Sequence, residues 1–334
     1  MEDIMRSMLP GAPWLLAHKS MLPTNKPVKV ALYGKDYVLW KDRNNNVQAL
    51  PNVCSHMGAM LSAGWCEAQE DGSSKVVCPF HALEFDTEGC TVLPGSGKRT
   101  KPLLEPLNLI IQDDFIWSYG EHEPQIEIPD IMDKITANYE FVGATANTSV
   151  ATSLLSMLLN NHDYNHQNGT HRDLFRIEEV QFEKFTDRGH YSEALFKTPT
   201  ASPTLSEVIR NPAVLALPKV IEAHLENHFP SLVILHAESP IATMAQCHFF
   251  VPEADDRTRT YILLFAKSKS VIFRLMKKTF LNLGKTVVAQ DIDILTRLYA
   301  DCPKKIKLNN EVGMDWVSRN FKNWPSIVEP NLSL

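Results

Sequence analysis

Two short motifs, each with one cysteine and one histidine, constrain this chain more than any other feature of its sequence. The first is Cys54-Ser55-His56, and the second, which follows after residues 57–77, is Cys78-Pro79-Phe80-His81. Asparagine, glycine and proline in and around the motifs are typical of tight turns. We therefore expect two loops that each bring one sulfur and one imidazole to a shared metal group, with backbone N–H groups pointing at the sulfurs.

This set of donors fits a cluster of two irons and two sulfides, in which two cysteines bind one iron and two histidines bind the other. The alternative is a zinc site with two cysteines and two histidines. Zinc fingers pair cysteine with cysteine and histidine with histidine along the chain, whereas the two residue types alternate here. The sequence therefore favours the iron–sulfur cluster.

Length and composition limit the remaining possibilities. The chain has 334 residues, 44% of them hydrophobic, and a net charge of −6. These values suit two domains, or one large domain, with a sizeable core, and make a nucleic-acid partner improbable. The sequence has no apolar run of membrane-spanning length and no secretory pattern at its start. We expect a cytoplasmic protein whose remaining cysteines, Cys66, Cys90, Cys247 and Cys302, are free thiols.

The pattern of elements divides the chain into two domains. Residues 1–120 show short β-type runs separated by turn signals, among them 28–33, 37–41, 47–50 and 107–117. Residues 121–135 are rich in proline and acidic residues and are predicted to be a linker. Residues 136–334 mix strands (177–185, 190–197, 231–237, 242–251 and 258–268) with helices (149–163, pieces of 202–227, and 271–299). The fold class is therefore α+β, with a curved antiparallel sheet wrapped around a long C-terminal helix.

A second group of possible ligands lies at the end of the predicted helix 149–163. Asp163 and His166 are three residues apart and share a helix face. His166 and His171 are too widely splayed on an ideal helix to bind one metal, but they can converge if the helix ends or opens near Gly169. Two imidazoles and one carboxylate would form a triad with open positions, which favours non-haem Fe(II) and O₂ chemistry. Polar side chains that simply end a packed helix are the alternative.

The missing carboxylate can be sought in the last long helix. Val287, Val288, Ile294, Leu295 and Leu298 recur with helical period and predict its buried stripe. Asp291 falls in that stripe, whereas Asp293 falls on the opposite face. A carboxylate that faces a core is costly unless it is paired or bound to metal, so Asp291 is the preferred third ligand.

A competing group is His224-x-Glu226-x-His228, which lies just before Pro230. It lacks the residue order of zinc proteases, and we interpret it as a surface or helix-end feature. His236 and His248 lie in predicted strands and could line a pocket, but we favour core positions for both.

These motifs resemble the catalytic α subunit of Rieske non-haem iron oxygenases over nearly the whole chain. Beyond the Cys/His motifs, the resemblance is carried by Trp14, residues 34–42, Asp86-x₂-Gly89, Asn160-x₂-Asp163-x₂-His166-x₄-His171, Gln290-Asp291 and residues 315–324. It implies an N-terminal all-β Rieske domain and a C-terminal helix-grip (START-like) domain. This chain departs from the family at Ser55-His56-Met57 and Ala82-Leu83, where Pro-His-Arg and Gly-Trp are usual. Loss of the arginine could change which electron donor docks.

The resemblance also implies a role for each residue. Cys54 and Cys78 would bind one iron of the cluster, His56 and His81 the other, and His166, His171 and Asp291 the mononuclear Fe(II). Asp163 would carry electrons between the cluster histidine of one subunit, His81, and the iron site of its neighbour, in a homotrimer.

The implied function is that of an oxygenase. It would use O₂, with electrons from a separate NAD(P)H-dependent ferredoxin or flavin reductase. The reaction would hydroxylate, oxidatively demethylate or desaturate an organic substrate, aromatic or natural-product in kind. The alternative is a non-catalytic Rieske electron carrier or redox sensor.

Overall fold

The chain forms two compact units, each with its own sheets. The computed structural model describes residues 6–145, 148–210, 219–239, 241–298 and 306–325. The first unit is Met1–Glu127 together with Val251–Asp255, and the second is Ile128–Phe250 together with Asp256–Leu334. The first unit thus ends inside the range predicted to be a linker, 121–135. Part of that range forms helix α2 (Ile131–Asn138).

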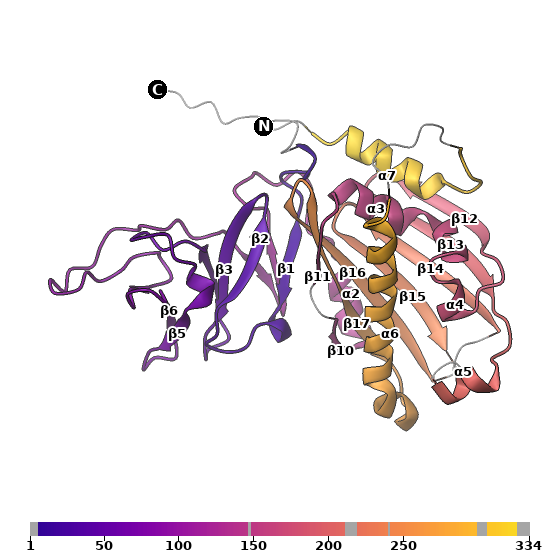
Figure 1. Ribbon diagram of the computed structural model, residues 1–334, viewed down its shortest axis with the longest axis horizontal. Helices are drawn as coiled ribbons and strands as arrows, with labels where there is room; N and C mark the ends of the chain where they lie inside the picture. Colours follow the sequence, from indigo (N-terminus) through magenta and orange to yellow (C-terminus); the bar gives the residue numbers. More distant parts are fainter. Residues whose placement is uncertain (1–5, 146–147, 211–218, 240, 299–305, 326–334) are drawn as a thin grey trace. The chain divides into compact units, whose positions relative to one another are not determined.

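The described part of the first unit is built from three small antiparallel sheets (Figure 1). Their strands, in spatial order, are β1 (Trp14–His18), β9 (Phe115–Ser118) and β8 (Ile110–Gln112); β2 (Val28–Leu32), β3 (Lys35–Lys41) and β4 (Val47–Pro51); and β5 (Trp65–Ala68), β6 (Ser74–Val77) and β7 (Glu84–Phe85). Residues 107–117, predicted as one run, form two strands because the chain turns at Asp113, whose φ is 51°. The first Cys/His motif follows β4, and the second follows β6.

The second unit is organised around one eight-stranded antiparallel sheet. Its strands, in spatial order, are β10 (Glu140–Ala144), β17 (Arg257–Lys267), β16 (Ala242–Ala254), β15 (Leu232–Ser239), β14 (Val220–His228), β13 (Tyr191–Pro199) and β12 (Gln181–Arg188), while β11 (Thr148–Val150) also pairs with β17. The alternation along β13 is strict, because Ser192, Ala194, Phe196 and Thr198 are buried and the residues between them are partly exposed. Alternation of this kind is typical of a strand with one face on the core.

The long helix α6 (Val271–Leu295) lies across the sheet (Figure 1). Ser270 caps its N-terminus by accepting a hydrogen bond from the N–H of Phe273. Phe273 and Leu281 then pack on Met244 and Leu264 of the sheet. The other helices are α3 (Leu154–His162), the 3₁₀ helix η3 (Tyr164–Asn168), α4 (Arg172–Phe175), α5 (Leu205–Arg210) and α7 (Val312–Lys322). The predicted α+β class, with an antiparallel sheet and a long helix across it, is confirmed. Within the described residues, no helix has the length and apolar character needed to cross a membrane.

Two predicted helices differ from the structure. Helix α3 begins at Leu154 rather than 149, because Thr148–Val150 pairs with β17 and Ser153 provides the N-cap. In the range 202–227, only Leu205–Arg210 is helical among the described residues, and Val220–His228 is a strand. The interpretation of His224 and Glu226 as a helix end was therefore wrong. Pairing with strands on both sides forms β14. The alternation of Ile221, Ala223 and Leu225 with polar residues is a local signal of this strand, which the prediction of helical pieces did not use.

Candidate metal centres

The two cysteine loops of the first unit share one backbone design. In each loop, with the cysteine as residue i, the N–H of the cysteine donates to the carbonyl of residue i+5. The carbonyl of the cysteine accepts from the N–H of residue i+4. These bonds are Cys54 to Ala59 (2.8 Å), Gly58 to Cys54 (2.9 Å), Cys78 to Leu83 (2.9 Å) and Ala82 to Cys78 (3.1 Å). The fifth residue of each loop, Gly58 or Ala82, has a positive φ, 75° and 53°. Two similar turns thus present the motifs, as the turn residues predicted.

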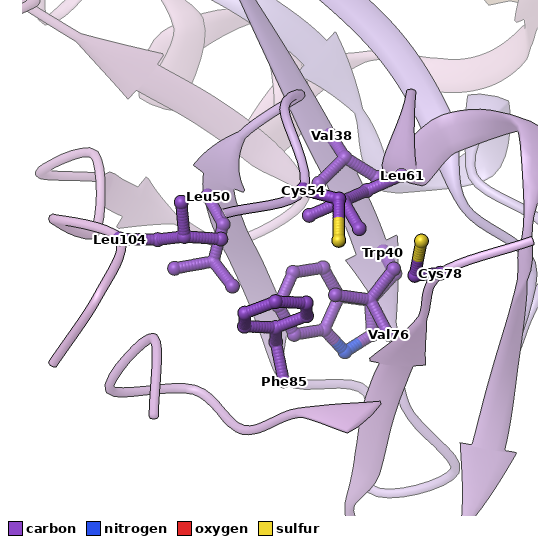
Figure 2. Packing of buried hydrophobic residues seen from close by; sticks show 9 residues of the cluster. All are labelled: Val38, Trp40, Leu50, Cys54, Leu61, Val76, Cys78, Phe85 and Leu104. Carbon is purple, nitrogen blue, oxygen red and sulfur yellow. The ribbon is translucent and has the colours of Figure 1, made fainter. Parts of the chain in front are cut away.

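Both cysteines are buried against the core of the first unit, and both are free thiols, as are the other described cysteines. Figure 2 shows Cys54 and Cys78 entering one space from different segments, beside Trp40 and Phe85. Burial, followed by the hydrogen bond with Cys78, raises the pKa of the Cys54 thiol, while the backbone N–H groups of His56 and Met57 act against this. A bound metal would favour the thiolate form of a cysteine at this position.

The two histidines of the motifs form a second pair. Nδ1 of His56 lies 3.2 Å from Nδ1 of His81, and the ring centroids are 4.7 Å apart. Both side chains are exposed, and so are the neighbouring Met57 and Phe80. A pair of buried thiols and a pair of exposed imidazoles fit a two-iron cluster with its histidine iron toward the surface. The four residues therefore suit that cluster better than a single zinc ion.

In the second unit, His166, His171 and Asp291 converge, and we call these three residues the first triad. One potential ligand atom from each lies within 4.8 Å of the others. Nε2 of His166 is 3.6 Å from Oδ1 of Asp291, and Nε2 of His171 is 3.3 Å from the same oxygen. Metal–nitrogen bonds of about 2.1 Å place neighbouring ligand atoms about 3 Å apart. The spacing of the first triad is close to that of a ligand set.

Local structure makes the two histidines converge. Helix α3 ends at His162, and residues Tyr164–Asn168 continue as a 3₁₀ helix. The hydrogen bonds of His166 O with the N–H groups of Gly169 (3.0 Å) and Thr170 (2.8 Å) turn the chain toward His171. The tighter 3₁₀ turn changes the angle between the side chains. Of the two predicted possibilities, the helix ends, with Gly169 as the C-cap of η3, rather than opening into a wide turn.

The Nδ1 atom of each histidine has a hydrogen-bond partner, so each Nε2 faces Asp291. Nδ1 of His166 is bonded to the carbonyl oxygen of Asp163, and Nδ1 of His171 lies 2.9 Å from Oε1 of Gln290. With both Nδ1 atoms as donors, each Nε2 has a free lone pair, as a metal ligand requires.

The charges of the first triad favour a metal. Burial acts to raise the pKa of Asp291, but the two imidazoles outweigh it and hold this pKa below its usual value. Burial lowers the pKa of His166. Burial also acts to lower the pKa of His171, yet Asp291 more than offsets this and the net shift is upward. Oδ1 of Asp291 is buried and has no hydrogen-bond partner among the described residues. A carboxylate oxygen left unpaired between two imidazoles is the position at which a divalent cation fits.

Asp163 lies at the junction between α3 and η3 and has two separate contacts. Its carbonyl oxygen accepts from Nδ1 of His166, while its carboxylate accepts from the N–H of Asn165 at 3.0 Å. The side chain also lines an open cavity of about 530 Å³, together with His166, Gln290 and Ile294. The carboxylate is therefore reachable from outside this unit.

The face of α6 that carries Asp291 was only partly predicted. Val288 and Leu295 are buried, and the Asp291 side chain is 14% exposed. Ile294 and Leu298, however, are exposed by 40% and 64%, so the buried stripe is narrower than predicted. Asp293 is on the exposed side, where it pairs with Arg297 at 2.5 Å.

Sequence reasoning named two residues beside the first triad, Gln290 and His248, but gave neither of them a role there. Gln290 precedes Asp291 and orients His171, but a polar residue in a helix carries no signal of its partner 119 residues away. His248 of β16 is partly buried, and burial lowers its pKa to about 4 despite the charge of Asp291. A neutral imidazole therefore lies near the first triad, rather than in the general core we favoured.

Residues 13–102 match the family model of the Rieske [2Fe-2S] domain, so the first unit is a Rieske iron–sulfur domain, as predicted. Beyond this domain, the chain is similar in sequence to the oxygenase components of several oxygenases and demethylases.

Aminopyrrolnitrin oxygenase PrnD of Pseudomonas fluorescens is 27% identical over 172 residues, which are 48% of this chain and 46% of the relative. The oxygenase component of dicamba O-demethylase from Stenotrophomonas maltophilia is 26% identical over 201 residues, 58% of this chain and 57% of the relative. Each match thus spans less than two-thirds of the relative. The crystal structure of dicamba monooxygenase bound to dicamba has a TM-score of 0.72 at 20% identity, covers 94% of this chain and 96% of that chain, and shows a shared fold.

Proposed function

We propose that this protein is a Rieske-type oxygenase, which uses O₂ and external electrons to oxidise a small organic molecule. The observation that carries the proposal is the first triad. Two imidazoles with free Nε2 atoms and an unpaired buried carboxylate oxygen converge in a chain that also has a Rieske domain. Mononuclear Fe(II) bound there would supply open positions for O₂ activation, and the Rieske cluster would supply electrons.

The surrounding residues prepare both sites. Gln290 and the carbonyl of Asp163 fix the orientation of the two imidazoles. The buried thiols of Cys54 and Cys78 sit in an apolar core that excludes water, while His56 and His81 reach the surface. We assign the exposed imidazole of His81 as the exit for electrons and the carboxylate of Asp163 as their entry to the first triad.

Asp163 also suggests the assembly. Its carboxylate lines an open cavity beside His166, and the cluster histidines are exposed beside Met57 and Phe80. These surfaces suit contact between the Rieske domain of one subunit and the second unit of a neighbour. We propose a homotrimer, in which each cluster serves the neighbouring first triad.

The substrate class and the donor follow from chemistry and from the relatives. The relatives include a 3-ketosteroid-9-alpha-monooxygenase, a vanillate O-demethylase and a dicamba O-demethylase. We propose an aromatic or natural-product substrate, which is hydroxylated, demethylated or desaturated. The sequence has no glycine-rich nucleotide-binding fingerprint, so we propose that a separate ferredoxin or flavin reductase uses NAD(P)H, and that the proteins act in the cytoplasm.

Iron analysis and turnover test this function. We expect about three irons per chain, two in a cluster with a Rieske electron paramagnetic resonance signal and one in the first triad. Candidate aromatic and terpenoid compounds, supplied with a surrogate reductase, should yield products that gain one oxygen atom, lose CH₂ or lose two hydrogens, only when O₂ is present.

Two substitutions on the same helix provide the comparison. Asp291→Ala should remove the mononuclear iron and abolish turnover while the Rieske signal is retained. Asp293→Ala, an exposed neighbour, should change neither. Full turnover by Asp291→Ala would disprove this assignment. A wild-type chain with only the two cluster irons and no turnover would instead indicate an electron carrier or redox sensor.

A further inference from the structure

A second group of three potential ligands lies on strands β14 and β15. It consists of His224, Glu226 and His236, and we call it the second triad. One ligand atom from each lies within 4.8 Å of the others. His224 and His236 are directly opposite each other in the antiparallel register, and their rings stack at 5.2 Å. Glu226 is two residues from His224 and therefore shares its face of the sheet. A strand pair, a rigid element, thus holds all three residues.

The second triad faces away from the first. Asn227, Val233 and His248 occupy successive positions across three strands and share one face of the sheet. Helix α6, which carries Asp291, packs on that face, because Phe273 of α6 clusters with Met244, which lies four residues from His248 on the same strand. Glu226 and its cross-strand neighbours Ile234 and Cys247 alternate with those residues and so lie on the other face. The two triads are separate sites on opposite sides of one sheet.

Two polar atoms of the second triad pair only with each other and make no hydrogen bond among the described residues. Oε2 of Glu226 and Nε2 of His236 are 3.4 Å apart, yet both are buried and neither makes a hydrogen bond among the described residues. The side chains are only 17% and 23% exposed. Buried polar atoms without hydrogen bonds lower the stability of the folded protein. The separation of 3.4 Å is close to the ligand spacing that metal bonds of about 2.1 Å produce.

The charge around the second triad also favours a cation. Glu193 of β13 lies directly opposite Glu226 of β14. Like charges at opposite positions of an antiparallel pair destabilise a sheet, and a cation beside Glu226 would offset this repulsion. Tyr191 donates a hydrogen bond to Glu193, which satisfies that carboxylate but not Glu226.

A route for a ligand is present. His224 and His236 line a cavity of about 640 Å³ together with Leu195 and Glu222. His236 also borders a smaller cavity of about 280 Å³ next to α2. Three protein ligands beside an open cavity leave at least one coordination position free, as in zinc sites with two histidines and one glutamate.

We propose that His224, Glu226 and His236 bind a divalent transition metal, with zinc as the preferred ion, independently of the first triad. Two imidazoles and a carboxylate suit zinc, and the divalent affinity order places zinc above iron. This proposal does not rest on the oxygenase function.

Zinc alone is the probe, and elemental analysis after equilibrium dialysis is the readout. Iron-loaded wild-type protein should bind one zinc per chain without losing iron. The Asp291→Ala variant, whose first triad is impaired, should still bind that zinc. Glu226→Gln should weaken zinc binding at least about tenfold, and His236→Ala should abolish it. Glu179→Gln, an exposed carboxylate outside the second triad and the cavities beside it, should bind zinc as the wild type does.

A second measurement needs no substitution in the second triad. In a His171→Ala/Asp291→Ala double variant, X-ray absorption at the zinc edge should show two imidazole ligands, which the remaining His166 of the first triad cannot supply alone. Absence of tight zinc in both wild type and Asp291→Ala would overturn the proposal. So would unchanged zinc binding by folded Glu226→Gln and His236→Ala, or a zinc shell without two imidazoles.

Discussion

Gln290 and His171 are joined by a hydrogen bond of 2.9 Å between Oε1 and Nδ1, across 119 residues of sequence. This bond connects α6 to the loop after η3 and fixes which imidazole nitrogen is available to Asp291. Because Gln290 precedes Asp291, one turn of helix supplies both a proposed ligand and the residue that orients another. Gln290 is a positioning residue, since it acts through His171.

The first prediction concerns this bond. Gln290→Leu removes the acceptor and should lower iron affinity at the first triad about 10- to 100-fold, the usual effect of losing such a partner. Gln290→Glu keeps an acceptor and should retain most of the affinity. Iron titration of protein depleted of mononuclear iron measures the effect, and the Rieske signal should be unchanged in both variants. Equal affinities for Gln290→Leu and the wild type would show that His171 does not need this orientation.

The second prediction concerns the cysteines. Cys54→Ser should remove the cluster, with loss of its visible absorption and of two irons per chain, because Cys54 is a proposed thiolate ligand. Cys66→Ser is the matched control. Cys66 also packs against this core, but burial raises its thiol pKa to about 12 and it lies outside the two motifs. A Cys66→Ser protein without a cluster, or a Cys54→Ser protein with a normal one, would contradict the assignment.

The third prediction concerns Gly64. A Cβ atom at this position would lie 1.9 Å from the carbonyl oxygen of Val77, the residue before Cys78. A clash with backbone cannot relax through a rotamer change, so Gly64→Ala should cost about 3 kcal/mol or more and reduce cluster content. Gly95→Ala meets no atom within 4 Å and only has to adopt a φ of +78°. Gly95→Ala should lower the unfolding free energy by about 1 kcal/mol and leave the cluster intact. Urea denaturation measures the first effect, and iron analysis measures the second.

The fourth prediction concerns stability in acid. His162 is buried beside Trp316, and burial lowers its pKa to about 4. The unfolded chain binds this proton near pH 6.5, whereas the folded protein does not until about pH 4. Neutral His162 therefore makes its full contribution to the unfolding free energy above pH 6.5. This contribution is lost as the pH falls toward 4, by at most about 3 kcal/mol. His162→Phe keeps a ring but cannot titrate, so the difference in unfolding free energy between pH 7 and pH 5 should shrink by about 2 kcal/mol. An unchanged difference would show that His162 titrates normally.

The sequence determined the metal chemistry of the first unit. Cys54, His56, Cys78 and His81 are local motifs in turns, and turn geometry depends on neighbouring residues, so donors and loops could be predicted together. Asp163, His166 and His171 were also accessible, because they lie within one short segment whose glycine signals the end of a helix. The division into strands and a long helix could also be predicted, because periodicity is a signal that lies within each segment.

Only the tertiary structure decided how distant segments meet. Helical period placed Asp291 on an inward face, but it could not show that Oδ1 is left unpaired between two imidazoles, nor that Gln290 reaches His171. His224 and Glu226 were misinterpreted because the alternation of Ile221, Ala223 and Leu225 with polar residues was not recognised as a strand. Only the register of β14 with β15 brings His236 opposite His224. Local sequence sets which face a residue occupies within its element. The packing of one element on another, which depends on the whole chain, sets which side chains share a site.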